Sequence, residues 1–306
     1  MNAFATSRPS PQAFATLLLL ATMFGANHVA ARVALDHGVD VPTAVAVRSL
    51  ATALVVGLLV QRARVPWQLT PRQRRVMPAI GVLVALQSVT LYSAVARIPV
   101  GLALLAFNTY PLWTAFAAWA LYRHRPERAV LLAMPVILAG LALALDLAGV
   151  AAGLAAGAPW QQVGQRLGGG VGFALLAAAL FGLVLALTQH EVAALDGRLR
   201  TTLSMGIVGV LALAAAVGGA GLHWPQAAAG WWGLVLLSVL YGTAFTVLFT
   251  LLPRLGVVGS SPILNVEPVA ALLLGAWVLG QQVAPVQWLG ALVVVGTVMA
   301  LGLRRR

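Results

Sequence analysis

Cysteine and lysine are both absent from this chain of 306 residues. Without cysteine, the chain can form no disulfide bond, thiolate nucleophile, cysteine-ligated metal site or palmitoyl anchor. Without lysine, it lacks the P-loop lysine of nucleotide-hydrolysing enzymes and the amine that forms Schiff bases. An ATP-hydrolysing P-loop is therefore excluded, and we expect packing alone to hold the fold together.

Charged residues are also scarce. They make up 8% of the sequence, against 61% hydrophobic residues and a mean hydropathy of +0.94, whereas a soluble domain has about 25% charged residues. This composition indicates an integral membrane protein. The net charge of +12 reflects 19 arginines that lie mostly between apolar segments, so no nucleic-acid partner is predicted. The five histidines are scattered without an H-E-x-x-H pair, and we predict no metal, no cofactor and no enzymatic activity.

Ten segments are apolar and long enough, at about 20 residues each, to cross a membrane as helices. They cover residues 13–34, 41–60, 76–96, 98–122, 129–149, 169–189, 201–221, 231–252, 256–280 and 284–303. The connections are short except for residues 150–168, a stretch rich in Ala, Gly and Gln that we interpret as the link between two halves.

The arginines predict how these segments are oriented, because cytoplasmic loops of membrane proteins collect basic residues. If the N-terminus is cytoplasmic, fifteen arginines fall on the inner side, and the outer side and outer membrane half hold only Arg32, Arg48, Arg97 and Arg166. This alternation requires an even number of spans, so both termini are predicted to be cytoplasmic. The first segment, at about 22 residues, is too long for the apolar core of a secretory signal, and we interpret it as a retained helix.

Two segments carry the same polar interruption. Asn108-Thr-Tyr-Pro111 is followed 157 residues later by Asn265-Val-Glu-Pro268. Two copies of a five-span unit must enter the membrane from opposite sides, and inverted repeats with broken helices are typical of transporters. The predicted fold is an all-α polytopic membrane protein with ten transmembrane helices in two inverted five-helix repeats. Its predicted parts are a cytoplasmic tail (1–12), a first repeat (13–149), a periplasmic connecting loop (150–168), a second repeat (169–303) and a basic cytoplasmic tail (304–306).

The prolines of the two motifs predict breaks in their helices. Pro111 and Pro268 have no N–H group, so the carbonyls four residues earlier lose their helical partners near the middle of the membrane. Asn108 and Asn265 lie on the same side of the turn, and an amide beside a free carbonyl can hold a polar substrate. Alternatively, each asparagine bonds a neighbouring helix and contributes only to packing.

Glu267 lies at the centre of the ninth predicted span, where a carboxylate costs roughly 2.5 kcal/mol or more. Three roles are compatible with this position: carrying a proton during transport, contacting a substrate or gate, and forming a static ion pair with Arg48. Arg48 lies about 10 Å from the outer end of its own span at 1.5 Å per residue. Its long side chain therefore has the alternative of extending outward to the membrane surface.

Other polar residues complete the predicted site. Asn27 and His28 lie in the first span, where the histidine either accepts a proton or is a neutral, hydrogen-bonded imidazole. Glu267 and Arg48 are predicted to serve coupling or ion pairing, and no catalytic residue is predicted. The predicted substrate-binding residues are Asn27, His28, Asn108, Tyr110, Pro111, Tyr241, Asn265 and Pro268.

Three stretches stand in a recognisable order and spacing. They are Phe24-Gly-Ala-Asn-His-Val-Ala-Ala-Arg32 with Arg48, Tyr92-Ser-Ala-Val-Ala-Arg97 leading to Tyr110-Pro111, and Arg254-Leu-Gly through Glu267-Pro268 to Leu279-Gly280. With these stretches the chain resembles, over nearly its whole length, the EamA-type branch of the drug/metabolite transporter (DMT) superfamily. The family commonly ends its fourth and ninth spans in Leu-Gly-Glu, whereas this chain has Leu121-Tyr-Arg123 and Leu279-Gly-Gln281. The resemblance implies a secondary transporter of the bacterial inner membrane with a central cavity between its halves.

The predicted function is a secondary transporter that exports amino acids or related small metabolites by alternating access. Its predicted partners are a small-molecule substrate and the lipid bilayer, with protons as the candidate coupling ion and no oligomeric state assigned. One alternative is a multidrug or other solute efflux or uptake protein of the same superfamily. Another is a membrane-embedded enzyme, but this would require clustered His, Asp or Glu near one membrane face, which the sequence lacks.

Overall fold

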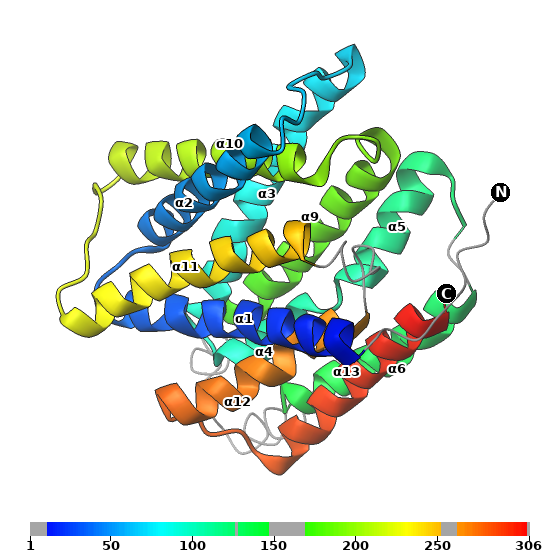
Figure 1. Cartoon of the computed structure of the whole chain (residues 1–306). Helices are drawn as coiled ribbons and strands as arrows, with labels where there is room; N and C mark the ends of the chain where they lie inside the picture. The colour runs from blue at the N-terminus through cyan, green and yellow to red at the C-terminus, as the bar shows by residue number, and fades with distance from the viewer. Residues whose placement is uncertain (1–10, 126–127, 147–168, 252–261, 305–306) are drawn as a thin grey trace.

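The computed structural model describes residues 11–125, 128–146, 169–251 and 262–304, and within these ranges every regular element is a helix (Figure 1). The predicted connecting loop 150–168 lies entirely outside the described residues, as do most of the two predicted tails and both Arg166 and Arg254. The first half of the chain forms α1 (Pro11–Asp36), α2 (Val41–Arg62), α3 (Pro71–Val95), α4 (Val100–Phe107), α5 (Tyr110–Tyr122) and α6 (Arg128–Ala144). The second half forms α9 (Gly170–Glu191), α10 (Gly197–Gly218), α11 (Ala228–Thr250), the 3-10 helix η3 (Pro262–Val266), α12 (Glu267–Leu279) and α13 (Pro285–Arg304).

The predicted membrane class is confirmed. Seven helical stretches in the described part are long and apolar enough to cross a membrane, with α4 and α5 together counting as one from Val100 to Tyr122. Three further apolar helices are shorter, and they cover Arg128–Ala144, Ile263–Leu279 and Pro285–Ala300. The chain is therefore an all-helical, multi-pass membrane protein, and the total of ten spans stays a prediction.

Local sequence signals define where several helices begin. Asp40 precedes α2 and its side chain accepts a hydrogen bond from the Thr43 amide at 3.0 Å. Thr70 and Gln73 form a reciprocal capping box at the start of α3. Such caps satisfy amide groups that a helix leaves unbonded in its first turn. They therefore stabilise the first turns of α2 and α3 next to the short connections.

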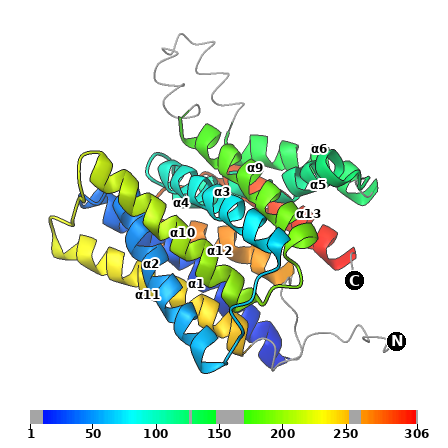
Figure 2. The ribbon, with the colours of Figure 1, turned by 90° about the horizontal axis from the view of Figure 1, so that it is seen from above.

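The helix contacts follow a two-fold pattern. If α1, α2, α3, α5 and α6 are matched with α9, α10, α11, α12 and α13, each major contact between the halves has a counterpart. α1 packs on α11 as α9 packs on α3, α1 packs on α12 as α9 packs on α5, and α2 packs on α11 as α10 packs on α3. Two pairs, α2 with α10 and α6 with α13, consist of equivalent helices from the two halves and therefore are their own counterparts. Helices α6 and α13 lie side by side in both views (Figures 1 and 2). The two halves therefore pack as structurally equivalent repeats.

A Phe-Gly pair shows the same equivalence at single residues. Phe24-Gly25 in α1 and Phe181-Gly182 in α9 are 157 residues apart, the same spacing as the two Asn-x-x-Pro motifs. A Cβ atom on Gly25 would lie 3.0 Å from the Ala271 amide nitrogen of α12, and one on Gly182 would lie 2.7 Å from the Thr114 nitrogen of α5. Each glycine therefore lets its helix contact the backbone of a helix that follows a break, α12 for Gly25 and α5 for Gly182. Both Phe-Gly pairs are visible in the sequence at this spacing.

The helix α4, which forms the first half of one broken span, lies in the core of the molecule. Seven residues of α4 are buried, from Val100 to Ala106. A Cβ atom on Gly101 would come within 2.2 Å of the Leu272 side chain of α12, so α4 and α12 approach closely. The helices that carry the two Asn-x-x-Pro motifs thus meet each other, which positions the candidate site at the boundary between the repeats.

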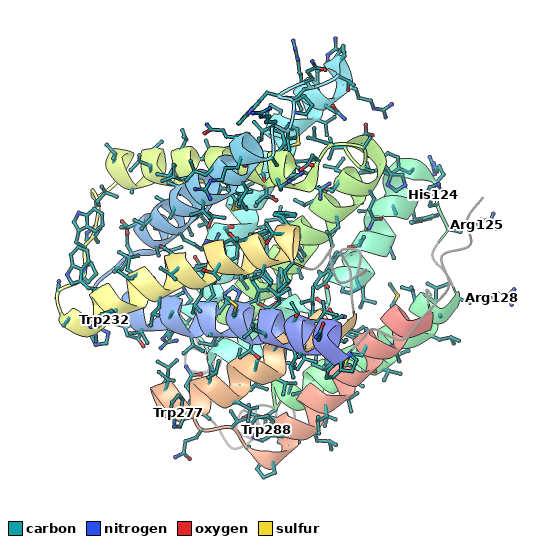
Figure 3. All side chains as sticks on the ribbon, in the orientation of Figure 1. His124, Arg125, Arg128, Trp232, Trp277 and Trp288 are labelled. Carbon is teal, nitrogen blue, oxygen red and sulfur yellow. The ribbon has the colours of Figure 1, made fainter. Side chains whose placement is uncertain are left out.

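Apolar side chains cover much of the outside, as expected for a surface that faces lipid. Leu132 is 72% exposed and Trp277 is 83% exposed. Figure 3 shows His124, Arg125 and Arg128 at the end of the molecule toward which α13 runs, while Trp232 and Trp277 lie toward the other end. These labelled basic side chains therefore lie at one end of the molecule, as expected where basic residues collect on one side of a membrane.

Candidate functional site

The two helix breaks occur at the predicted motifs. α4 ends at Phe107 and α5 begins at Tyr110, and in the second repeat the 3-10 helix η3 passes into α12 at Glu267. Pro111 and Pro268 occupy the first turns of α5 and α12, where a missing N–H costs no helical hydrogen bond. Glu267 is therefore the first residue of a half-helix, and the positive end of the helix dipole favours a carboxylate there.

The two motifs touch each other through their polar side chains. The Tyr110 hydroxyl donates a hydrogen bond to Asn265 Oδ1 at 3.1 Å. The Tyr110 ring packs edge-on against Phe181 of α9, with 5.2 Å between ring centroids. Asn108 is buried beside the first break, at 4% exposure. Tyr110 and Asn265 thus join the repeats directly.

Glu267 contacts a histidine of the other repeat. His28 Nε2 lies 3.3 Å from Glu267 Oε1, with the histidine 6% exposed and the carboxylate side chain 26% exposed. His28 Nδ1 is buried and has no partner within the described ranges. One ring nitrogen of His28 thus faces the other repeat, and the second has no partner among the described residues.

The predicted ion pair between Glu267 and Arg48 is wrong. Within the described part of the chain, Arg48 has no carboxylate oxygen within 4.0 Å, and Glu267 pairs with His28. Hydropathy placed both residues inside the membrane, but the rotation of each helix decides which side chains meet.

The outward-extended alternative for Arg48 is also wrong, since the residue is only 3% exposed. Arg48 Nη1 donates to the Tyr92 hydroxyl at 3.0 Å and Nη2 donates to Ser88 Oγ at 3.2 Å. Its guanidinium carbon lies 4.3 Å from the ring centroid of Tyr241. These hydroxyl and ring contacts turn the side chain inward, away from the membrane surface.

Tyr92 is the central residue that sequence reasoning missed as a site residue. It is fully buried on α3, accepts from Arg48 and donates to Asn27 Oδ1 at 3.1 Å. Asn27 Nδ2 in turn donates to the Leu237 carbonyl of α11 at 2.6 Å. Both ends of the Asn27 amide are thus engaged within the protein, which favours a helix-linking role for this residue.

A usable signal was present in the tyrosine count. The chain has four tyrosines, and Tyr92, Tyr110 and Tyr241 all lie in this region. Because a buried tyrosine hydroxyl needs a hydrogen-bond partner, tyrosines inside predicted spans were candidates for the polar site. We call Asn27, His28, Arg48, Ser88, Tyr92, Tyr110, Tyr241, Asn265 and Glu267 the central polar cluster.

Gln281 stands at the end of the ninth predicted span, where the EamA-type resemblance predicts a glutamate. Its Oε1 accepts a hydrogen bond at 3.2 Å from the amide of Val100, the first residue of α4. The preceding Gly280 has φ of 63°, a left-handed conformation that ends α12 and that glycine adopts without strain. Gln281 therefore caps a helix of the other repeat, a role that needs an acceptor oxygen but no charge.

A second polar cluster lies where α9 ends, and sequence reasoning did not predict it. Arg72 forms two hydrogen bonds to the Glu191 carboxylate, one of them from Nη2 to Oε1 at 2.9 Å. The Tyr122 hydroxyl donates to the same Oε1 at 2.8 Å, and the His190 ring stacks on Tyr122 at 3.9 Å. His190 Nε2 lies 3.0 Å from His124 Nδ1. This α9-end cluster joins both repeats at one end of the molecule.

Comparison with known proteins identifies the family of this chain. The model of the EamA-like transporter family matches the chain twice, over residues 12–145 and 168–303. The chain belongs to the EamA-like transporter family. Membership places it among the membrane transporters of the DMT superfamily, which act on small molecules within a lipid bilayer, and points away from an enzyme.

The other comparisons concern the fold of this EamA-like transporter. A solved structure, described only as a "Crystal structure of protein", aligns with a TM-score of 0.59 at 17% sequence identity. The alignment covers 98% of this chain and 100% of the solved one, so the whole helical arrangement is shared. No curated protein matches the chain.

Proposed function

We propose that this EamA-like transporter exports amino acids or related small metabolites by alternating access. The observation that carries the proposal is the central polar cluster, which links the helix breaks of the two repeats through Tyr110 and Asn265 at 3.1 Å. Paired broken helices at a repeat interface are where secondary transporters bind substrate. Equivalent contacts in the two halves also support alternating access, because each repeat can then adopt the other's packing.

We further propose a topology of ten spans in two inverted repeats, with both termini in the cytoplasm of a bacterial cell. The three short apolar helices support this count as spans, since the 17 residues of α6 extend about 25 Å at 1.5 Å per residue. That length approaches the roughly 30 Å hydrocarbon core of a bilayer. The unequal distribution of arginines supports the orientation. The proposed parts keep the predicted bounds: tails at 1–12 and 304–306, repeats at 13–149 and 169–303, and a periplasmic loop at 150–168.

The pair of His28 and Glu267 is our candidate for proton coupling. The two residues belong to different repeats and their side chains are 3.3 Å apart. A movement of α1 against α12 would change this distance and with it the cost of a charged carboxylate inside the membrane. Such a carboxylate would release a proton in one conformation and bind it in the other. Asn108, Tyr110 and Asn265 are the proposed substrate contacts.

The experiment is transport in vesicles that contain the purified protein, with labelled amino acids as probes. We expect a proton gradient to accelerate movement of at least one amino acid, and Glu267→Gln to abolish the effect of the gradient. Asp36→Asn is the matched control, since this acid is bonded to Arg32 in an exposed pair away from the central polar cluster. The proposal fails if no solute moves under any gradient, and proton coupling through Glu267 fails if the glutamine variant keeps the wild-type response.

A further inference from the structure

We infer that the substrate binds with an anionic group, a carboxylate, against Arg48. The inference rests on the proposed transport function and names the chemical class of what the central polar cluster holds. Its starting point is a buried positive charge without a negative partner. Arg48 is 3% exposed, and no carboxylate in the described ranges forms an ion pair with it.

The hydrogen bonds of Arg48 are incomplete. A guanidinium has five N–H donors. In the described structure, one bond from Nη1 reaches Tyr92, one from Nη2 reaches Ser88, and Nε, although buried, has no acceptor. Both acceptors are neutral hydroxyls, and removing a full charge from water is costly unless an opposite charge approaches. Arg48 is therefore short of both hydrogen-bond acceptors and negative charge.

Glu267 does not supply that charge, because it lies against His28. His28, which also lies near Tyr92, adds a second unsatisfied atom, its buried Nδ1. The His28 ring centroid is 5.6 Å from that of Tyr92, and the Arg48 guanidinium is 4.9 Å from the same ring. Buried polar atoms without partners are uncommon in folded proteins. Here two of them flank one tyrosine at the repeat interface, as expected where a ligand completes the bonding.

The two repeats differ at the position of this charge. The position 157 residues after Arg48 is Met205 on α10, which is buried at 5% exposure. Since α2 and α10 pack against each other as equivalent helices, one position accepts an apolar side chain where the other holds an arginine. The buried charge is therefore particular to the first repeat, and we assign it a role in binding.

The neighbouring side chains indicate what the anionic group is attached to. Tyr241 contacts the Arg48 guanidinium at 4.3 Å and packs against Phe245 with ring centroids 4.9 Å apart. Phe24 lies 5.9 Å from the ring of Tyr241. A guanidinium binds a carboxylate through two parallel hydrogen bonds, and this aromatic group would contact an apolar body. The substrate class is therefore a small carboxylate with an apolar or aromatic side, and an amine without a carboxylate is excluded.

The test measures thermal stabilisation of the purified full-length protein by four probes: phenylalanine, 3-phenylpropionate, 3-phenylpropionamide and phenethylamine. We expect the two carboxylates to raise the melting temperature with concentration, as ligands of the native state do, and the amide and amine to be without effect. Phenyl phosphate is a fifth probe. If it alone stabilised the protein, the site would bind a phosphate, and the assignment of a carboxylate would be overturned. Equal stabilisation by phenethylamine would overturn the anionic class altogether.

Variants then assign the effect to Arg48. We expect Arg48→Gln to abolish carboxylate binding and Arg48→Lys to weaken it about tenfold or more, since lysine keeps the charge but loses the bidentate geometry. Met205→Gln, at the equivalent position of the second repeat, is the matched control. We expect the carboxylates to raise its melting temperature, measured from that of the ligand-free variant, as much as they raise that of the wild type. If Arg48→Gln does not fold, the order of the probes on the wild-type protein still decides the inference. Vesicles that transport the amine as well as the carboxylate would refute the anion site while leaving the transport function intact.

Discussion

The hydroxyl of Tyr110 in the first repeat donates a hydrogen bond to Asn265 Oδ1 in the second, across 3.1 Å. These residues belong to the two copies of one motif, and each stands at the break of its own span. The bond therefore fastens the two broken helices to each other. Any exchange of conformation between the repeats has to strain or open it.

A double-mutant cycle measures this bond. We expect Tyr110→Phe and Asn265→Ala each to lower the free energy of unfolding, with a coupling energy of about 0.5–1.5 kcal/mol between them. Single and double variants are compared by reversible unfolding in detergent. Tyr122→Phe paired with Asn265→Ala serves as the control cycle, because Tyr122 bonds Glu191 instead. Additive effects of Tyr110→Phe and Asn265→Ala would show that the contact does not link the repeats energetically.

The paired glycines predict a matched loss of stability. We expect Gly182→Ala to cost about 1–3 kcal/mol, because the added Cβ would meet Trp113 and Thr114 at 2.6 and 2.7 Å. Gly25→Ala is expected to act in the same direction with a smaller effect, since its nearest backbone atoms are at 3.0 Å. Gly172→Ala is the control on the same helix α9, where a Cβ would meet nothing within 4 Å. Equal melting temperatures for Gly182→Ala and Gly172→Ala would contradict the close approach of α9 to α5.

Single cysteines test the proposed topology without background, because the native chain contains none. We expect Arg125→Cys to react with a membrane-impermeant thiol reagent only after the cells are permeabilised. Trp224→Cys is expected to react in intact cells, and Trp224 is 47% exposed between α10 and α11. Labelling is read as a mass increase of the purified protein. Reaction of Arg125→Cys in intact cells would reverse the orientation assigned from the arginines.

The start of α10 predicts an acid-sensitive contribution to stability. The side chain of Arg198 bonds the Asp196 carboxylate, with Nη2 and Oδ2 at 2.8 Å, and this lowers the pKa of Asp196 below its usual value. A carboxylate with a lowered pKa in the folded state stabilises the fold above its unfolded pKa and loses that contribution as the pH falls through the folded one. We expect wild-type stability to decline below about pH 4.

The comparison for Asp196 is Asp196→Asn, which still has an acceptor oxygen for the amide at the start of α10 but cannot ionise. Its melting temperature is expected to be lower than wild type at neutral pH and to approach wild type below about pH 4. Melting temperature is measured across the acid range for both proteins. A constant difference at every pH would show that Asp196 contributes only as a cap.

The sequence alone predicted where the spans are interrupted and which residues could be polar partners. Proline removes an amide wherever it occurs in a helix, so the breaks at Pro111 and Pro268 follow from residue identity alone. The repeat was visible because equivalent positions recur at a constant spacing. Gln281 shows the limit of this approach, since nothing local in the sequence indicates that it caps α4 some 180 residues earlier.

The composition of this chain determined that it is a helical membrane protein, because a chain with 8% charged residues cannot expose its surface to water, and the spacing of its motifs determined that it is a duplication. Three contacts became apparent only in the folded chain: Glu267 lies against His28, Arg48 bonds Tyr92, and Arg72 bonds Glu191. Hydropathy depends on which residues are apolar, whereas these contacts depend on the rotation and tilt of each helix. Those are set by packing between helices far apart in the sequence, such as α1 against α12.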